Sequence, residues 1–370
     1  MTLDERMRQA GASVRRYADQ EVDPVAMLWR LRAHERRRSR QTAAVVALAV
    51  LAGLVAAAVL VVRIPRQPEV LTPPGLGRVA ATIPIPGAAF PRVVGVADGL
   101  VWVDGDNATA YRVDPQSNRV AGTVALPAGS RLAAVGQGSL WLTNDAAGTV
   151  SQADPGTGTI LQTVTVGAVQ EFSHPHQEGL RLALDGEVVW VARLHTDVVR
   201  LDWASGKVAG RFTIGLPGSS SYDLIAAGSG VAVTHGETND ADQLDPRTGK
   251  ATAIHLGGPP AGAAFGAGSF WVSAQNSTLA RIDPAGRRVV ATISLDADHL
   301  PGALVVGDGT VWVFAGGGLV QRIDVAANQV VHTLAVGPQG VDSGRLAVGA
   351  GAVWLSDAEA RTLIRIDPQD

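Results

Sequence analysis

The chain of 370 residues contains no cysteine. This absence excludes disulfide bonds, thiolate metal sites and a cysteine nucleophile. Lysine is also scarce, because only Lys207 and Lys250 occur while the other 29 basic residues are arginine. No GxSxG or P-loop pattern is present, and no pair of histidines has the HExxH spacing of a zinc protease.

The negative charge is modest and unevenly placed. Residues 1–42 hold ten arginines against six acidic residues, a net charge of +4. Residues 43–62 are uncharged, and since the whole chain carries −3, residues 63–370 carry −7. Nucleic-acid binding calls for a basic patch, so a nucleic-acid partner is not expected.

Residues 43–62 are an apolar run of 20 residues, AAVVALAVLAGLVAAAVLVV. Twenty residues match the length of a helix that spans a bilayer. A cleaved signal peptide is the alternative, but its apolar region is usually shorter and the leader here is long. We expect an uncleaved signal anchor in the lipid bilayer. The arginines before it predict a cytoplasmic N-terminus and an extracytoplasmic C-terminal domain in the cell membrane.

The segments on either side of this run differ in character. Residues 1–42 contain helix-forming stretches, notably 25–40, and are predicted to be a short helical cytoplasmic tail. The tail's arginines are explained by topology, by contact with anionic lipid, or by docking of a cytoplasmic regulator. Residues 63–77 hold four prolines, which favour a semi-rigid extended linker.

The rest of the chain is built from a repeated unit, best seen in GQGSLWLTNDAAGTVSQADPGTG, residues 136–158. Each copy has a Gly turn, a strand carrying a tryptophan, and an aspartate 12 or 13 residues later. The tryptophan positions are Trp102, Trp141, Trp190, Trp271, Trp312 and Trp354, with Val233 in that position in the remaining copy. The aspartates are Asp114, Asp154, Asp202, Asp245, Asp283, Asp324 and Asp367. Seven units 38 to 49 residues apart predict four-stranded propeller blades.

The two ends of the repeat region complement each other. The seventh copy stops near Asp367 without an outer strand, and an extra outer-type strand, RVAATIPIP, precedes the first copy at 78–86. Pairing the two would remove an open sheet edge. We therefore predict an all-β fold, a seven-bladed β-propeller over residues 78–370 that is closed by its N-terminal strand.

Side-chain patterns assign roles within each blade. In DPQSNR, DPGTGT and DPRTGK the proline presets the first turn angle, and Gly or Asn then supplies a positive φ. The repeated tryptophans lie among aliphatic residues and are expected to pack between blades, although a sugar-stacking surface is an alternative. Trp203 replaces the proline of blade three and is expected in an exposed turn.

The GxGxxW units (GQGSLW, GAGSFW, GDGTVW, GAGAVW) and the RIDP units at 281–284 and 365–368 resemble the YVTN-type β-propellers and their streptogramin-lyase and NHL relatives. The resemblance covers about 78–370. The lyase resemblance implies a histidine ten residues before the tryptophan and a metal-binding glutamate four residues after it. The residues at the first position are Arg92, Arg131, Leu180, Asp223, Ala261, Gly302 and Gly344. Those at the second are Asp106, Asp145, Leu194, Glu237, Gln275, Gly316 and Ala358, so only Glu237 matches.

The polar loops of blades three and four give the candidate site. The candidate ligand-binding residues are His174, His176, His195, Asp223, His235 and Glu237, with Glu171, Glu178, Asp197, Asp240, Asp242 and His299 on the same predicted face. Imidazole and carboxylate groups together are able to hold a divalent metal, here through Asp223, His235 and Glu237. The same groups also suit a polar ligand, acid–base chemistry, or no specific role.

These observations favour a bacterial, membrane-anchored binding or sensor module for a protein or cell-envelope ligand. A metal-assisted lyase or hydrolase on blades three and four is the first alternative. A structural scaffold is the second.

Overall fold

The computed structural model describes residues 77–169, 179–186, 188–193, 197–214, 222–227, 230–235, 238–245, 247–295, 300–337 and 344–368. The predicted tail, membrane span and linker, residues 1–76, lie outside this part of the chain. Within the described part, no helix has the length and apolar character needed to cross a bilayer.

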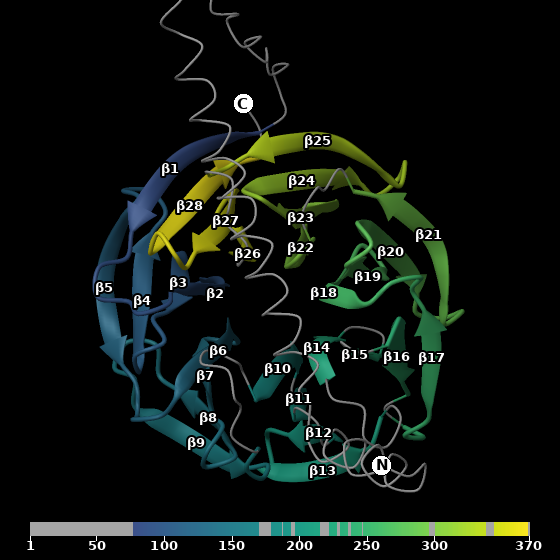
Figure 1. Ribbon diagram of the computed structural model, residues 1–370. Coiled ribbons are helices and arrows are strands. Elements are labelled where there is room, and N and C mark those ends of the chain that lie inside the picture. Colours follow the sequence, from purple (N-terminus) through teal and green to yellow (C-terminus); the bar gives the residue numbers. More distant parts are fainter. Residues whose placement is uncertain are drawn as a thin grey trace, which may run out of the picture. The chain divides into compact units, whose positions relative to one another are not determined.

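The described strands form seven four-stranded antiparallel sheets arranged around a central axis (Figure 1). Blade one consists of β2 (Arg92–Ala97), β3 (Leu100–Asp104), β4 (Thr109–Asp114) and β5 (Arg119–Ala125). Blade two consists of β6 (Arg131–Gly136), β7 (Ser139–Asn144), β8 (Thr149–Ala153) and β9 (Ile160–Thr165). Blade three consists of β10 (Leu180–Asp185), β11 (Val188–Arg193), β12 (Asp197–Asp202) and β13 (Lys207–Phe212). Blade four consists of β14 (Tyr222–Ala227), β15 (Val231–His235), β16 (Asp240–Leu244) and β17 (Ala251–His255).

The remaining blades follow the same plan. Blade five consists of β18 (Pro260–Gly266), β19 (Ser269–Ala274), β20 (Thr278–Asp283) and β21 (Arg288–Ser294). Blade six consists of β22 (Leu304–Gly307), β23 (Thr310–Gly316), β24 (Leu319–Asp324) and β25 (Gln329–Ala335). Blade seven consists of β26 (Gly344–Gly349), β27 (Ala352–Asp357), β28 (Thr362–Asp367) and the N-terminal strand β1 (Arg78–Pro84).

Strand β1 closes the ring as predicted, because it pairs antiparallel with β28 and supplies the outer strand of blade seven. Ile83 lies opposite Leu363, and both side chains are buried in the same apolar cluster. The backbone N–H of Ile85 then bonds to the carbonyl of Arg361. The first and last strands of the propeller are therefore joined by a hydrogen-bonded ladder and a shared core.

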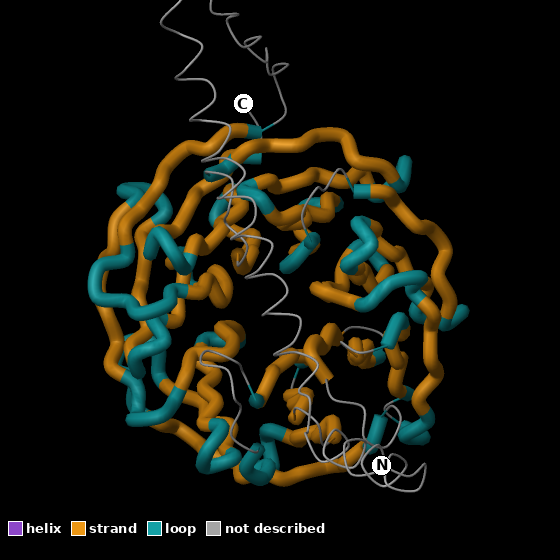
Figure 2. Tube along the Cα trace, viewed as in Figure 1, coloured by secondary structure: helices purple, strands orange, loops and turns teal. Residues whose placement is uncertain are grey.

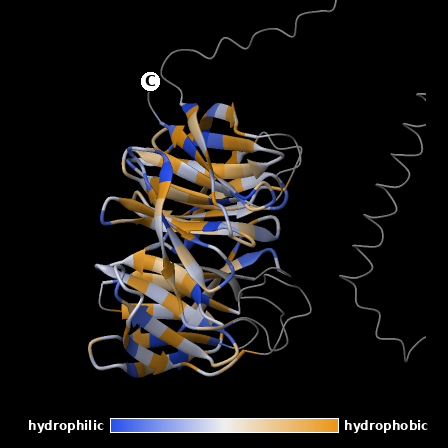
Figure 3. Ribbon diagram, turned by 90° about the vertical axis from the view of Figure 1, so that its left-hand side faces the viewer, coloured by the Kyte–Doolittle hydropathy of each residue, from blue (hydrophilic) through white to orange (hydrophobic). Residues whose placement is uncertain are grey.

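Burial changes from the second strand of each blade to the outer strand. All six residues of β19 are buried, whereas the outer strand β21 alternates exposed and partly buried residues. A strand that touches a neighbouring blade on each face must be apolar on both faces, and an outer strand meets water on one. Figure 2 shows the strands of each blade stacked outward from the centre of the ring, and the side view in Figure 3 shows apolar residues along these strands.

The tryptophan of each unit is core, as the repeat predicted. Trp141 and Trp271 are completely buried, and each donates its indole N–H to the carbonyl of the Gly five residues earlier, at 3.2 and 3.1 Å. That Gly begins the GxG turn. In the copy at Gly136, both central turn residues, Gln137 and Gly138, have positive φ, as a two-residue type I′ hairpin requires. The GxGxxW unit is thus a turn closed by its own tryptophan.

Strand pairing corrects the assignment of the seventh tryptophan position. The sequence placed Val233 there, but Val233 lies opposite Asp242, while Ala232 lies opposite Gln243. In blade five, Trp271 lies opposite Arg281, which is two residues before Asp283, the repeated aspartate of that unit. Gln243 is likewise two residues before Asp245, the repeated aspartate of blade four. Ala232 therefore occupies the tryptophan position, one residue earlier than the position that the sequence count gave it.

Trp203 is also corrected, since its expected exposed position is wrong. The residue is 8 % exposed and its ring packs edge-on against Trp141 of blade two, with ring centroids 4.5 Å apart. Its indole N–H donates to Oε1 of Gln152 at 2.8 Å. The ring lies over the blade-two tryptophan because Gln152 is shorter than the arginine found at the equivalent position of most blades.

Candidate functional site

The residues predicted as a site from the sequence are only partly described. His174, His176, His195 and Glu237 lie outside the described residues, as do Glu171, Glu178 and His299. Asp223 lies on β14, and His235 ends β15 opposite Tyr222, with only their backbone described. In the part of the chain that the structure describes, no three His, Asp or Glu side chains are grouped to hold a metal ion. The metal at Asp223, His235 and Glu237 stays a prediction.

Two of the described acidic residues of this predicted site, Asp197 and Asp240, are found in ion pairs. Asp197 is buried, and its carboxylate lies 3.1 Å from Arg193 and 3.2 Å from Arg211. Asp240 accepts a contact from Nδ1 of His255 at 3.0 Å on the exposed edge of blade four. Both pairs join strands within one blade. They do not lie on the cavity described next.

A cavity of about 670 Å³ lies near the central axis of the ring, at the end where the inner strands begin. The described residues of its wall come from six blades, through the first residues of β2, β6, β10, β18, β22 and β26. The connections before β2 and β22 contribute Phe90 and Leu300, and the β19–β20 connection contributes Gln275. The cavity therefore lies on the face formed by the connections that enter the inner strands and by those between the second and third strands of the blades.

Four arginines line this cavity, and they occupy one equivalent position in the ring. Arg92, Arg131, Arg181 and Arg345 lie opposite Asp104, Thr143, Ala192 and Ser356 in their hairpins. Each of these opposite residues is two positions after the blade's tryptophan. Among the residues described as lining the cavity, every ionisable one is an arginine. Closure of the ring makes their blades, seven, one, two and three, consecutive.

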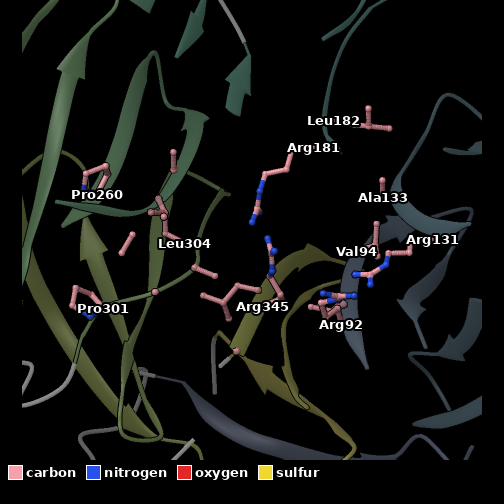
Figure 4. A pocket seen from close by; sticks show the side chains of 18 of the residues that line it. Arg92, Val94, Arg131, Ala133, Arg181, Leu182, Pro260, Pro301, Leu304 and Arg345 are labelled. Carbon is pink, nitrogen blue, oxygen red and sulfur yellow. The ribbon is translucent and has the colours of Figure 1, made fainter. Parts of the chain in front are cut away.

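The same position in the other three blades carries no charge. It is Leu224 in blade four, Gly262 in blade five and Ala303 in blade six. The wall of blades five and six is completed by Pro260, Leu300, Pro301 and Leu304. Figure 4 shows the arginines on one side of the cavity and Pro260, Pro301 and Leu304 on the other. The cavity thus has a cationic side and an apolar side.

Two arginines of the cationic side, Arg92 and Arg131, form ion pairs with carboxylates beside the cavity. Oδ1 of Asp106 lies 3.0 Å from Nη2 of Arg92 and 3.2 Å from Nη2 of Arg131. Asp104 lies 3.5 Å from Arg92 and also accepts the backbone N–H of Leu132 at 3.2 Å. One carboxylate thereby links blades one and two beside the cavity. Asp145 links blades two and three in the same way, by accepting the N–H groups of Gly179 and Leu180.

The charge of Asp104 is costly in this position. Burial raises its pKa from 3.8 to about 6, and the nearby Arg92 opposes the rise without cancelling it. Asp106 adds to the rise, while Arg131 and the Leu132 N–H oppose it. A buried carboxylate loses the hydration that stabilises its ionised form. The Asp104 side chain therefore titrates closer to neutral pH than an ordinary aspartate does.

Sequence reasoning missed the arginines although the pattern was visible. It examined the position ten residues before each tryptophan for histidine, and Arg92 and Arg131 stood there. Arg181 and Arg345 lie only nine residues before their tryptophans. The difference is a one-residue irregularity in β2 and in β6 that β10 and β26 lack. Arginine at nine or ten residues before the tryptophan was the signal.

Comparison with known proteins supports the fold. No family model matches the chain, and no curated protein matches it. Among solved structures, the chain is similar to the WD40 domain of Pan2 from Neurospora crassa, with 12% identity and a TM-score of 0.59, covering 80% of this chain and 96% of that one. It is also similar to BamB from Moraxella catarrhalis, with 12% identity and a TM-score of 0.56, covering 79% of this chain and 100% of that one. At this identity the likeness is one of fold.

Proposed function

We propose that this chain is a membrane-anchored binding or sensor module whose extracytoplasmic propeller holds a ligand in its central cavity. One observation carries the proposal: six blades contribute to one cavity of about 670 Å³, and four of them place an arginine at the same position in it. The volume falls within the range typical of small-molecule sites, which is roughly 300–1,000 Å³. A propeller fold by itself selects no ligand, so the cavity is what favours binding.

The cavity wall is suited to holding a ligand in place. Guanidinium groups stay protonated at every physiological pH and present their donors in a fixed fork. Their supporting contacts, such as Asp106 with Arg92 and Arg131, fix the side chains from behind. Groups held by such supporting contacts lose little conformational entropy when a ligand arrives.

The membrane part of the proposal is supported by the apolar run 43–62 and by the arginines of 1–42. It is tested by adding protease to intact cells. Cleavage of the propeller without lysis is expected. Protection that disappears only on lysis would contradict the orientation.

Binding in the cavity is tested by filling it. Ala303→Phe places a large side chain in the wall at the ring position of blade six and leaves the arginines intact. Ala285→Phe, on an exposed turn of blade five, is the matched control. The full-length protein and both variants, in a neutral detergent, are incubated with an extract of the source cells, and retained compounds are identified by mass spectrometry. A compound retained by the wild type and Ala285→Phe but lost by Ala303→Phe is expected. Equal retention by all three would overturn the cavity as the site.

A further inference from the structure

The division of the cavity into two sides defines the chemical class of its ligand. We infer that the cavity binds a small amphipathic anion, with a carboxylate or phosphate on the arginine side and an apolar body against blades five and six. This inference rests on the proposed function, since it specifies what the same cavity holds.

The arginine side is built for an anion. Arg181 and Arg345 come from blades three and seven and extend toward one another across the cavity (Figure 4). An anion that lies between two guanidinium groups is attracted to both. A planar guanidinium also matches the two oxygens of a carboxylate or phosphate, so two of them hold such a group in one orientation.

The surroundings strengthen this attraction. The Arg92 side chain is 9% exposed, and Arg181 and Arg345 are half-buried. Charges removed from bulk water interact more strongly, because the effective dielectric constant around them is lower. Nη1 of Arg131 is buried and has no hydrogen-bond partner among the described residues. Buried donors normally have partners, so a ligand oxygen would complete this one.

The apolar side of the cavity indicates that the rest of the ligand is apolar. Pro260, Pro301 and Leu304 are buried there, and Leu300 is 47% exposed although it is a large apolar residue. The ring positions on this side, Gly262 and Ala303, carry no charge. A ligand with an apolar body would cover Leu300 and gain from removing apolar surface from water. A bare inorganic anion uses only half of such a cavity.

The inference is tested by calorimetric titration of the full-length chain in a neutral detergent. The probes are 2-naphthoate, 2-naphthyl phosphate, their neutral analogue 2-naphthamide, and acetate. The two naphthyl anions are expected to bind more tightly than either naphthamide or acetate. Arg181→Gln and Arg345→Gln should each weaken the anions by about 10- to 100-fold, the value of a charged hydrogen bond. They should leave any binding of naphthamide unchanged.

Two controls keep the result specific. Arg119→Gln removes an exposed arginine from the outer strand β5 and should leave all affinities unchanged. Leu300→Ser should weaken 2-naphthoate more than acetate, because it removes apolar wall and no charge. Thermal unfolding of each variant verifies that it is folded.

The opposite outcomes are distinct. Equal affinity for 2-naphthamide and 2-naphthoate, or unchanged anion affinity in both arginine variants, would overturn the inference. Binding of a glutamate-rich peptide without binding of the small anions would also overturn it, in favour of a polypeptide partner. If Ala303→Phe still abolishes retention of a compound from the extract, the proposed function survives the loss of this inference.

Discussion

Trp203 of blade three donates its indole N–H to Oε1 of Gln152 in blade two at 2.8 Å. The two residues depart from the repeat together, because Gln152 stands where most blades have arginine and Trp203 stands where most have proline. In blade seven the unmodified pair is seen: Arg365 stacks on Trp354 and donates to the carbonyl of Pro115 in blade one. Blades two and three thus use a different pair of residues for the same joint.

Loss of the Trp203 ring should be strongly destabilising. Trp203→Ala is expected to lower the free energy of unfolding by about 3–5 kcal/mol, because it leaves a cavity beside Trp141. Trp203→Phe keeps most of the packing and loses the bond to Gln152, so a smaller cost of about 1–3 kcal/mol is expected. Leu161→Ala, at a residue 59% exposed, should change stability by less than about 0.5 kcal/mol. Urea unfolding measures the stability of all three variants. An unchanged free energy of unfolding in Trp203→Ala would show that this contact between blades two and three does not stabilise the protein.

The closing strand should contribute to the stability of the whole ring. Ile83→Ala on β1 removes a side chain that is 2% exposed, and a loss of about 2–5 kcal/mol is expected. Val79→Ala on the same strand is the matched control, because Val79 is 37% exposed. Urea midpoints of the two variants decide the matter. Similar midpoints would mean that pairing of β1 with β28 does not hold the ring closed.

The arginine that joins blades five and six should not be replaceable by lysine. Arg281 donates to Ser269, to the Val325 carbonyl and to Asn328, at 3.0, 2.8 and 2.9 Å. Lysine keeps the charge but lacks the planar fork that reaches all three partners. Arg281→Lys is expected to cost about 1–3 kcal/mol of unfolding free energy. Arg288→Lys, at an exposed position of β21, should be neutral in the same urea experiment, and equal effects would refute the joint.

Asp104 should make stability depend on pH between about 4 and 6. Its pKa is about 6 in the folded protein and near 3.8 when unfolded, so in this window the folded state holds a proton that the unfolded state has lost. The contribution of Asp104 is therefore most favourable below pH 3.8 and is lost as the pH rises through 6. Two units of pKa correspond to about 3 kcal/mol.

The test compares the wild type with Asp104→Asn, which cannot ionise. The unfolding free energy of the wild type is expected to fall relative to the variant as pH rises from about 4 to 7. The turn aspartates, including Asp154 and Asp324, have pKa values held low by hydrogen bonds, so their stabilisation is lost only as pH falls below the ordinary range. These aspartates are present in both the wild type and Asp104→Asn, so their effects cancel in the difference between the two unfolding free energies. A constant difference across this range would mean that Asp104 titrates normally.

Much of the fold followed from periodicity alone. A tryptophan 12 or 13 residues before an aspartate occurs six times, and a seventh copy lacks only the tryptophan, so the blades can be counted without coordinates. An unpaired outer-type strand at 78–86 implies its partner at the other end. Local chemistry then fixes each piece, as in the type I′ turn at Gln137 and Gly138. Two predictions were wrong. Val233 was assigned to the tryptophan position, which Ala232 occupies. Trp203 was predicted to be exposed because it lies in a turn, but its ring packs on Trp141 of the neighbouring blade.

The candidate site depended on tertiary structure for a physical reason. Arg92, Arg131, Arg181 and Arg345 are spaced ten, ten, nine and nine residues from their tryptophans, and only strand register shows that these positions are equivalent. Arg345 and Arg92 lie more than 250 residues apart in the chain, yet closure by β1 makes their blades neighbours. Sequence by itself determined the repeat, its core residues and the closing strand. The ring decided which side chains share the cavity, because sequence separation carries no information about which blades meet when a circle is closed.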